Sequence, residues 1–323
     1  MNTIEVKNLK RIYRTTTGVI RRKHKDVVAV EDISFDIKEG ELFGLLGPNG
    51  AGKTTSVKVL ATLLIPDAGE VRVKGLDIVK DANEVRKQIG FIFGGERGLY
   101  WRLSGIDNLR YFASLYHVDP DLSKKRIPEL LELVGLEGRG DERVQGYSRG
   151  MKQRLHVART LLHDPDILFL DEPTIGLDPV GAREFREVIR NLQSEKKTIL
   201  LTTHYMFEAD SLCDRVAVID KGLIVALDTP SALKKHVRDL SVVEIETFGI
   251  APQKVDEIRA LPFVDALSTR EQDQRQVLLV QTERGAEAVP DLMSALDGMR
   301  GGRVTVREPT LEDAYVRLVG GKV

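Results

Sequence analysis

The chain has 323 residues with 48 basic and 49 acidic side chains, which leaves a formal net charge of −1. This length favours about two domains, and the interspersed charges create no broad positive field for nucleic acid. The single cysteine, Cys213, excludes an internal disulfide and suits a reducing compartment. The sequence has neither an apolar run of the ~18–20 residues that span a bilayer nor a signal-peptide core, so we expect it to reach a membrane only through a partner.

Residues 1–40 alternate between apolar and polar side chains, which predicts short β-strands. Between these strands, the polar stretch 15–26 carries a basic run at residues 21–25. The stretch predicts a solvated hairpin loop, with contact to anionic lipid head groups as the alternative.

A glycine-rich loop, GPNGAGKTT, follows an apolar segment at residues 41–46 and precedes a helical pattern that ends before Pro66. It fits the phosphate-loop pattern G-x-x-x-x-G-K-[ST], in which backbone N–H groups and the helix N-terminus surround the phosphates of a nucleotide. We expect the phosphates to be bound by Gly47, Pro48, Asn49, Gly50, Ala51, Gly52, Lys53, Thr54 and Thr55.

Helical periodicity dominates residues 100–165, and an apolar strand then ends in two carboxylates, Asp171 and Glu172. A magnesium nucleotide needs such a pair, because one acid holds the metal and the other orients the attacking water. Together with the phosphate loop, this pair predicts a nucleoside triphosphatase. Further strands are predicted at residues 198–203, 216–219 and 223–227.

After about residue 237 the predicted order becomes strand, helix, strand, strand, helix, strand, which matches the ferredoxin-like split βαβ unit. We therefore predict a nucleotide-binding domain at 1–236, with a helical subdomain at about 100–165, and an α+β accessory domain at 237–323. The accessory domain could sense a small ligand, stabilise a dimer or protect the first domain, and its residues do not select among these roles.

Residues 147–155 read YSRGMKQRL, with Ser148 as a predicted helix N-cap. This stretch resembles the LSGGQ signature of ABC-type ATPases, and the resemblance continues through TIGLDP at 174–179 and LTTH at 201–204. The motifs cover about residues 1–235. The YSRGM form and the PTLEDAY segment at 309–315 are similar to those of the drug- and lipid-exporter ATPases, a group that includes the antibiotic-resistance exporters and eukaryotic subfamily A.

The resemblance implies a P-loop NTPase of the ABC type with an antiparallel β subdomain beside the helical one. It assigns catalytic roles to three residues: Lys53 neutralises phosphate charge, Glu172 polarises the attacking water and His204 contacts the γ-phosphate. It also assigns Mg²⁺ to Thr54 and Asp171.

A second chain is implied by the same resemblance. Ser148, Gly150 and the start of their helix would complete the ATP site of the opposite subunit, Asp178 would couple the two sites, and Tyr13 would stack on adenine. ATP would thus close a homodimer, or a pair with a second ATPase subunit, and hydrolysis would open it. The family's membrane-spanning permease is a separate protein, which would place this chain in the cytoplasm on the inner face of the cell membrane.

One position departs from the family pattern, which has a glutamine after the strand at residues 89–93. Here residues 93–101 read FGGERGLYW, so we assign no metal ligand there; Glu96 or the backbone alone could take the place of the glutamine. The aromatic pair Tyr100 and Trp101 predicts the contact with the permease, with core packing as the alternative.

Two other functions compete with the exporter subunit. A soluble ABC-type ATPase acting on nucleic acid or ribosomes usually carries two ATPase units, whereas this chain has one. A small-molecule kinase would leave the signature unexplained and would transfer phosphate to an acceptor rather than to water. The transported substrate cannot be read from the sequence, because substrate contacts lie mainly in the membrane subunit.

Overall fold

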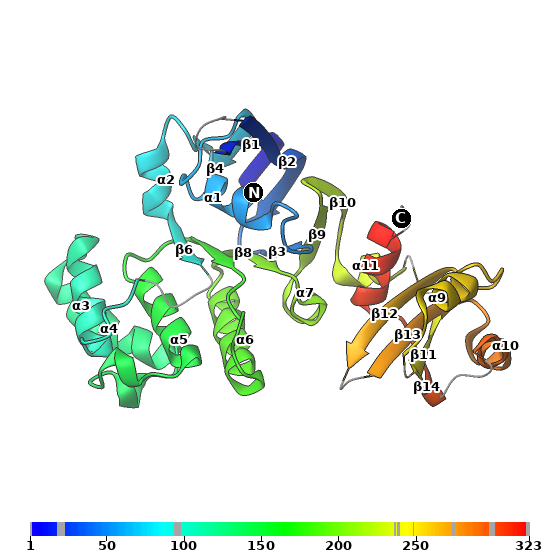
Figure 1. Cartoon of the computed structure of the whole chain (residues 1–323). Helices are drawn as coiled ribbons and strands as arrows, with labels where there is room; N and C mark the ends of the chain where they lie inside the picture. The colour runs from blue at the N-terminus through cyan, green and yellow to red at the C-terminus, as the bar shows by residue number, and fades with distance from the viewer. Residues whose placement is uncertain are drawn as a thin grey trace. The chain divides into compact units, whose positions relative to one another are not determined.

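The computed structural model describes residues 2–17, 23–93, 98–235, 237, 240–247, 249–272, 275–296 and 301–320. The chain divides into two compact units, Met1–Ile224 and Val225–Val323 (Figure 1). The expected boundary between residues 236 and 237 stays a prediction.

A ten-stranded sheet organises the first unit, in the order β5-β4-β1-β2-β10-β9-β3-β8-β7-β6, and the chain passes into the second unit within β10. Its strands are β1 (Asn2–Thr17), β2 (Lys23–Lys38), β3 (Leu42–Leu46), β4 (Ala68–Val73), β5 (Leu76–Asp77), β6 (Ile89–Phe93), β7 (Ile167–Asp171), β8 (Thr198–Thr203), β9 (Arg215–Asp220) and β10 (Leu223–Asp228).

The strands β9, β3, β8, β7 and β6 pair in parallel and form the core of this sheet. Every residue of β3, β7 and β8 is buried, as expected for parallel strands covered on both faces. The register sets Leu46 opposite Thr203, and Asp171 opposite Thr202. The carboxyl ends of β3, β7 and β8 therefore meet at one edge, which is where ligands bind in such sheets.

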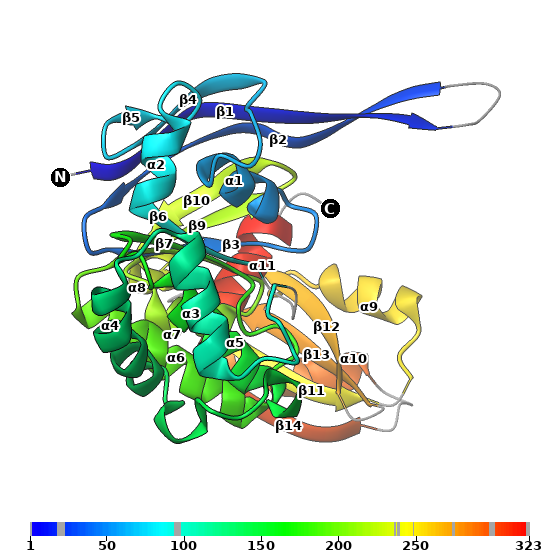
Figure 2. The same ribbon diagram turned by 90° about the vertical axis from the view of Figure 1, so that its left-hand side faces the viewer.

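Strands β1, β2, β4 and β5 form the antiparallel part of the sheet. Figure 2 shows β1 and β2 running side by side beyond the neighbouring strands. The predicted loop at 15–26 is therefore too long, since β1 continues to Thr17 and β2 begins at Lys23. A two-stranded ribbon with polar side chains gives no apolar alternation by which to recognise it. Arg21 and Arg22 of the basic run lie outside the described residues.

Helix α1 follows the glycine-rich loop and packs against both β2 and β7. Helices α3, α4 and α5 pack on one another and form the predicted helical region. The helices of this unit are α1 (Lys53–Leu60), α2 (Ala82–Gln88), α3 (Gly105–Leu115), α4 (Pro120–Leu133), α5 (Arg149–Thr160), α6 (Pro179–Ser194) and α7 (Met206–Leu212), with 3-10 turns η1 (Glu137–Arg139) and η2 (Val144–Gly146). The side chains of Ser148 and Asp178 cap α5 and α6 by accepting from first-turn N–H groups, which confirms the predicted cap at Ser148.

The second unit contains a four-stranded antiparallel sheet in the order β12-β13-β11-β14. Its elements are α8 (Pro230–Lys235), β11 (Ser241–Thr247), α9 (Pro252–Arg259), β12 (Ala266–Gln272), β13 (Arg275–Thr282), η3 (Gly285–Ala288), α10 (Val289–Ala295), β14 (Gly301–Arg307) and α11 (Leu311–Gly320). The predicted βαββαβ order and its ferredoxin-like topology are confirmed. The apolar core includes Val243, Ile245 and Leu278 from the sheet and Ile258 and Leu292 from the helices.

An ion pair between the partly exposed Arg307 and the buried Asp313 connects α11 to this sheet. Arg307 Nη1 donates to Asp313 Oδ2 at 2.6 Å, and Arg307 Nε donates to Glu244 Oε1 at 2.7 Å. The backbone N–H and the hydroxyl of Thr310 also donate to Asp313 Oδ2, at 2.7 and 2.8 Å. Burial opposes ionisation of Asp313, but the bonds from Arg307 and Thr310 outweigh it and hold the pKa of this carboxyl below its usual value.

We predict that Asp313→Asn lowers the free energy of unfolding of this unit by about 2 kcal/mol, because it removes the buried charged acceptor of Arg307 and Thr310, while Arg307 keeps its pair with Glu244. Asp291→Asn, which breaks an exposed pair with Arg284, should cost less than about 1 kcal/mol. Hydrogen exchange of the β11 and β13 amides in the full chain measures both. Because the folded pKa of Asp313 is lowered, its contribution is complete above the unfolded aspartate pKa of about 3.9 and disappears as the pH falls through the lowered value. Equal effects of the two variants at neutral pH would contradict this role.

Candidate active site

The glycine-rich loop connects β3 to α1 and holds Lys53 almost fully buried, with 4% of the residue exposed. Lys53 Nζ donates to the carbonyl oxygens of Gly47 at 2.7 Å and Pro48 at 3.1 Å. A Cβ at Gly47 would lie 2.2 Å from the Ile219 carbonyl oxygen, and Gly52 has a φ of +110°. The loop therefore requires glycine at both positions. No side chain caps α1, so the N–H groups of its first turn are available to an anion.

A pocket of about 310 Å³ opens over this loop. It is lined by Asn49, Gly50, Gly52, Lys53, Thr54 and Thr55 of the loop and α1, by Tyr13, Val27, Val28 and Ala29 of the β1–β2 hairpin, and by Glu172. The Tyr13 hydroxyl lies 3.5 Å from Thr55 Oγ1. The hairpin thus brings an aromatic ring and apolar side chains to the phosphate loop, a combination suited to a flat base attached to phosphates.

Asp171 ends β7 and is buried, with 5% of the residue exposed. Its Oδ1 accepts from Thr54 Oγ1 at 3.0 Å and from Thr202 Oγ1 at 2.6 Å. The carboxylate is therefore held between the start of α1 and the end of β8.

Glu172 follows immediately and has a φ of +49°, an uncommon conformation for a residue with a side chain. Its backbone N–H donates to the carbonyl and hydroxyl oxygens of Thr202, at 3.1 and 3.0 Å. Its Oε1 lies 3.1 Å from Lys53 Nζ, and its Oε2 pairs with His204 Nδ1. Lys53, Glu172 and His204, the residues predicted to be catalytic, are therefore connected side chain to side chain. A carboxylate fixed in this way can accept a proton from a water in the pocket.

Ser148, Gly150 and Asp178 lie together on another surface. The Asp178 carboxylate accepts from the Gly181 N–H at 2.8 Å, and a Cβ on Gly150 would be 3.6 Å from Gly181 Cα. Ser148 and Asp178 are exposed, and Gly150 is half-buried. These three described residues are not among those that line the pocket over the phosphate loop. The starts of α5 and α6 therefore form a separate surface.

Sequence reasoning missed two polar groups behind the site. Thr202 positions both Asp171 and the backbone of Glu172, and Glu208 accepts hydrogen bonds from Thr174 and Thr203. The available signals were two threonines at the end of a buried strand and a glutamate four residues after His204. Neither signal indicates a partner, because the partners come from other segments of the chain.

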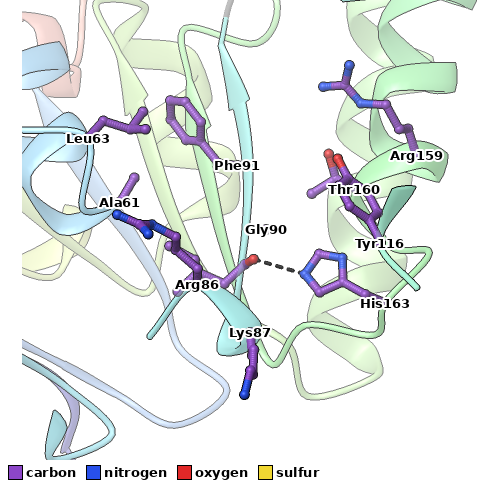
Figure 3. A pocket seen from close by; sticks show the side chains of 11 residues that line it. Ala61, Leu63, Arg86, Lys87, Gly90, Phe91, Tyr116, Arg159, Thr160 and His163 are labelled. Atoms are coloured by element: carbon purple, nitrogen blue, oxygen red, sulfur yellow. Dashed lines mark hydrogen bonds between the residues drawn. The ribbon is translucent and has the colours of Figure 1, made fainter. Parts of the chain in front are cut away.

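A second pocket, of about 660 Å³, lies between the sheet and the helical region (Figure 3). It is lined by Ala61, Leu63, Arg86, Lys87, Ile89, Gly90, Phe91, Tyr116, Arg159, Thr160 and His163. Figure 3 shows Arg86 on one side and Arg159 and His163 on the other, with His163 Nε2 placed 3.1 Å from the Ile89 carbonyl oxygen. Burial lowers the pKa of His163, so the fixed positive charges of the pocket are those of Arg86, Lys87 and Arg159.

Tyr100 and Trp101 are 47% and 50% exposed, so core packing does not account for them. Residues 94–97, including Glu96, lie outside the described part of the chain. Within the described part, no helix has the length and apolar character needed to cross a membrane.

Comparison with known proteins identifies the family. The sequence profile of the ABC transporter family matches residues 30–175. The daunorubicin resistance ATP-binding protein DrrA3 of Streptomyces coeruleorubidus is 38% identical, over 94% of this chain and 95% of that protein. The Nod factor export ATP-binding protein I of Ralstonia nicotianae is 37% identical, over 93% of this chain and 92% of that protein. The solved structure of cbiO1 from Clostridium perfringens, part of the ABC transporter complex cbiONQ, is 28% identical with a TM-score of 0.62, and the match covers 72% of this chain and 90% of that one.

These similarities confirm the resemblance seen in the motifs and the predicted P-loop fold of the ABC type. They do not favour an ATPase that acts on nucleic acid. The chain therefore belongs to the ABC transporter family, in the group of exporter ATP-binding subunits, and it is an ATP-binding and ATP-hydrolysing protein.

Proposed function

We propose that ATP drives two such subunits together and that hydrolysis separates them, which powers export through a separate integral-membrane permease. The supporting observation is the separation of two surfaces on one chain. Lys53, Glu172 and His204 are connected at the phosphate loop, whereas Ser148 and Asp178 lie exposed elsewhere. If the Ser148 surface of a second subunit completes the ATP site, both the connected residues at the phosphate loop and the exposed position of Ser148 and Asp178 are explained. The second subunit is another copy of this chain or a related ATPase.

In this proposal the phosphate loop, residues 47–55, surrounds the β- and γ-phosphates with backbone N–H groups, and Tyr13 stacks on adenine. Lys53 Nζ already contacts two carbonyl oxygens and Glu172, so it is positioned to meet phosphate oxygens from the floor of the pocket. The first turn of α5 from the second subunit would approach the γ-phosphate with its N–H groups and partial positive charge.

The oxygens of Thr54 and Asp171, 3.0 Å apart, fit a magnesium ion. A hydroxyl and a carboxylate are hard oxygen donors, and Mg²⁺ is usually held by one or two protein groups together with substrate phosphates. When bound, Mg²⁺ would neutralise charge on the phosphates. Thr202 would keep the Asp171 carboxylate oriented toward Thr54.

Glu172 accepts the proton of the attacking water in this scheme. Its carboxylate borders the pocket and is oriented by His204 on one oxygen and by Lys53 on the other. The imidazole of His204 would hold the carboxylate and contact the γ-phosphate. The proton then leaves the water as its oxygen attacks phosphorus, and ADP departs.

We place the permease contact at the second pocket and assign its occupant as a cytoplasmic segment of the permease with an acidic side chain on an apolar face. Three cationic side chains, Arg86, Lys87 and Arg159, surround apolar walls there. Leu63, one of the lining residues, is 54% exposed, and Tyr100 and Trp101, which the sequence predicts as permease contacts, are exposed as well. This contact would hold the subunit on the cytoplasmic face of the membrane.

Glu172→Gln should retain ATP binding, lower turnover by roughly 100- to 10,000-fold because the general base is lost, and trap a dimer with ATP. Phosphate release and light scattering of the eluted protein measure the two effects. Glu187→Gln, an exposed position on α6, serves as the control. Undiminished turnover would contradict the role of Glu172, and an inactive variant that stays monomeric with ATP would contradict the dimer.

Lys53→Ala should weaken ATP binding itself by about 10- to 100-fold, because charge-assisted bonds to the phosphates are lost. Isothermal titration with ATP gives the dissociation constant. Lys58→Ala removes a charge from the same helix outside the pocket and should bind ATP normally. An unchanged affinity in Lys53→Ala would argue against the assigned phosphate contact.

Lys87→Glu should reduce co-purification of the permease severalfold, since it places negative charge beside an acidic partner. The permease is the polytopic membrane protein that co-elutes with the chain from detergent-solubilised native cells. Lys124→Glu is a matched control, because Lys87 and Lys124 are exposed and each pairs with an acid three residues earlier. Equal loss of the permease in both variants, or in neither, would place the contact elsewhere.

A further inference from the structure

Glu208 is a buried acid outside the residues that line the ATP pocket. It lies on α7 with 3% of the residue exposed. Its Oε1 accepts from Thr174 Oγ1 at 2.5 Å, and its Oε2 accepts from Thr203 Oγ1 at 2.8 Å. The Arg186 guanidinium lies 3.8 Å from Oε1. A buried carboxylate is costly to desolvate, so its hydrogen bonds to these two hydroxyls are strongly favoured.

Thr203 fixes the backbone on both sides of His204. Its hydroxyl donates to Glu208 and also accepts from the Tyr205 N–H at 3.0 Å. The carboxylate therefore orients the hydroxyl that holds the turn from which His204 reaches Glu172.

Thr174 connects the other oxygen of Glu208 to the segment 174–178, which ends at Asp178. Thr174 is separated from Glu172 only by Pro173, whose φ is fixed by its ring. A closed ring results: Glu172 contacts His204, Thr203 precedes His204 and contacts Glu208, and Glu208 contacts Thr174. Displacement of the 174–178 segment must therefore change the position of His204 or break a bond of this ring.

We propose that Glu208 is a positioning residue that transmits the state of the 174–178 segment to the catalytic pair Glu172 and His204. The proposal rests on the dimer described above, in which the Asp178 surface meets the second subunit. Contact at that surface fixes Thr174, and Glu208 then fixes Thr203 and orients His204. Hydrolysis thereby depends on closure although Glu208 is not among the residues that line the ATP pocket.

A double-mutant cycle in the full chain tests this coupling. Thr174→Val removes the hydroxyl and should lower kcat about 10- to 100-fold, as expected for misplacement of catalytic groups, with less than about a twofold change in the ATP dissociation constant. Thr174→Ser, which keeps the hydroxyl, should restore kcat. In a Glu208→Gln background, Thr174→Val should add less than about twofold, because both variants break the same connection. Thr247→Val, at a buried threonine of the second unit, should leave kcat unchanged.

Multiplicative effects of Thr174→Val and Glu208→Gln would overturn the proposal, as would a normal kcat in Thr174→Val. If Thr174→Val does not fold, Thr174→Ala replaces it in the cycle with the same expected results. The Glu172→Gln variant separates this inference from the proposed function. If Glu172→Gln is fully active, the proposed function is wrong. If it is inactive and the effects of Thr174→Val and Glu208→Gln multiply, only the role of Glu208 is wrong.

Discussion

The contact between Lys53 and Glu172 is the interaction on which the rest of the site depends. The Lys53 side chain is only 5% exposed, and an ammonium buried to this degree needs compensation. Glu172 and the carbonyl oxygens of Gly47 and Pro48 supply it. The same position is where nucleotide phosphates are expected, so phosphate oxygens and Glu172 compete for one ammonium. In the proposed mechanism, binding of ATP would therefore weaken the contact between Lys53 and Glu172 and leave the carboxylate to His204 and the attacking water.

This chemistry is possible because the parallel sheet brings three strand ends together. Leu46 and Thr203 are opposite one another, as are Asp171 and Thr202, so the phosphate loop, the two acids and His204 leave the sheet at the same edge. The antiparallel hairpin contributes Tyr13 from a separate part of the sheet. Each strand is short and buried, and the carboxylate of Asp171 at the end of β7 is held by a hydrogen bond from Thr202 of the neighbouring β8. A rigid sheet edge can keep catalytic groups within the narrow tolerance that phosphoryl transfer demands.

The sequence predicted the parts whose signals are local. The phosphate loop, the two acids after an apolar strand, the cap at Ser148 and the βαββαβ order of the second unit all follow from patterns within a few neighbouring residues. Thr202 and Glu208 were not predicted, because their roles depend on the pairing of β7 with β8 and on the approach of α7 to residue 174. The length of the β1–β2 hairpin was also missed, since ladder hydrogen bonds between polar strands leave no apolar period. The separation of the Ser148 and Asp178 surface from the pocket could be recognised only in the folded structure.

The contacts around Glu172 both orient its side chain and offset the cost of its backbone conformation. Its left-handed backbone costs of order 1–3 kcal/mol and persists only where neighbouring groups determine it strongly. Thr202 holds its N–H with two oxygens, and His204 and Lys53 hold its side chain. Pro173 and Thr174 then fix the chain that leaves it, with Thr174 bound to the buried Glu208. The groups around Glu172 therefore stabilise a costly backbone conformation that keeps its carboxylate at the pocket, where the proposed mechanism has water attack phosphorus.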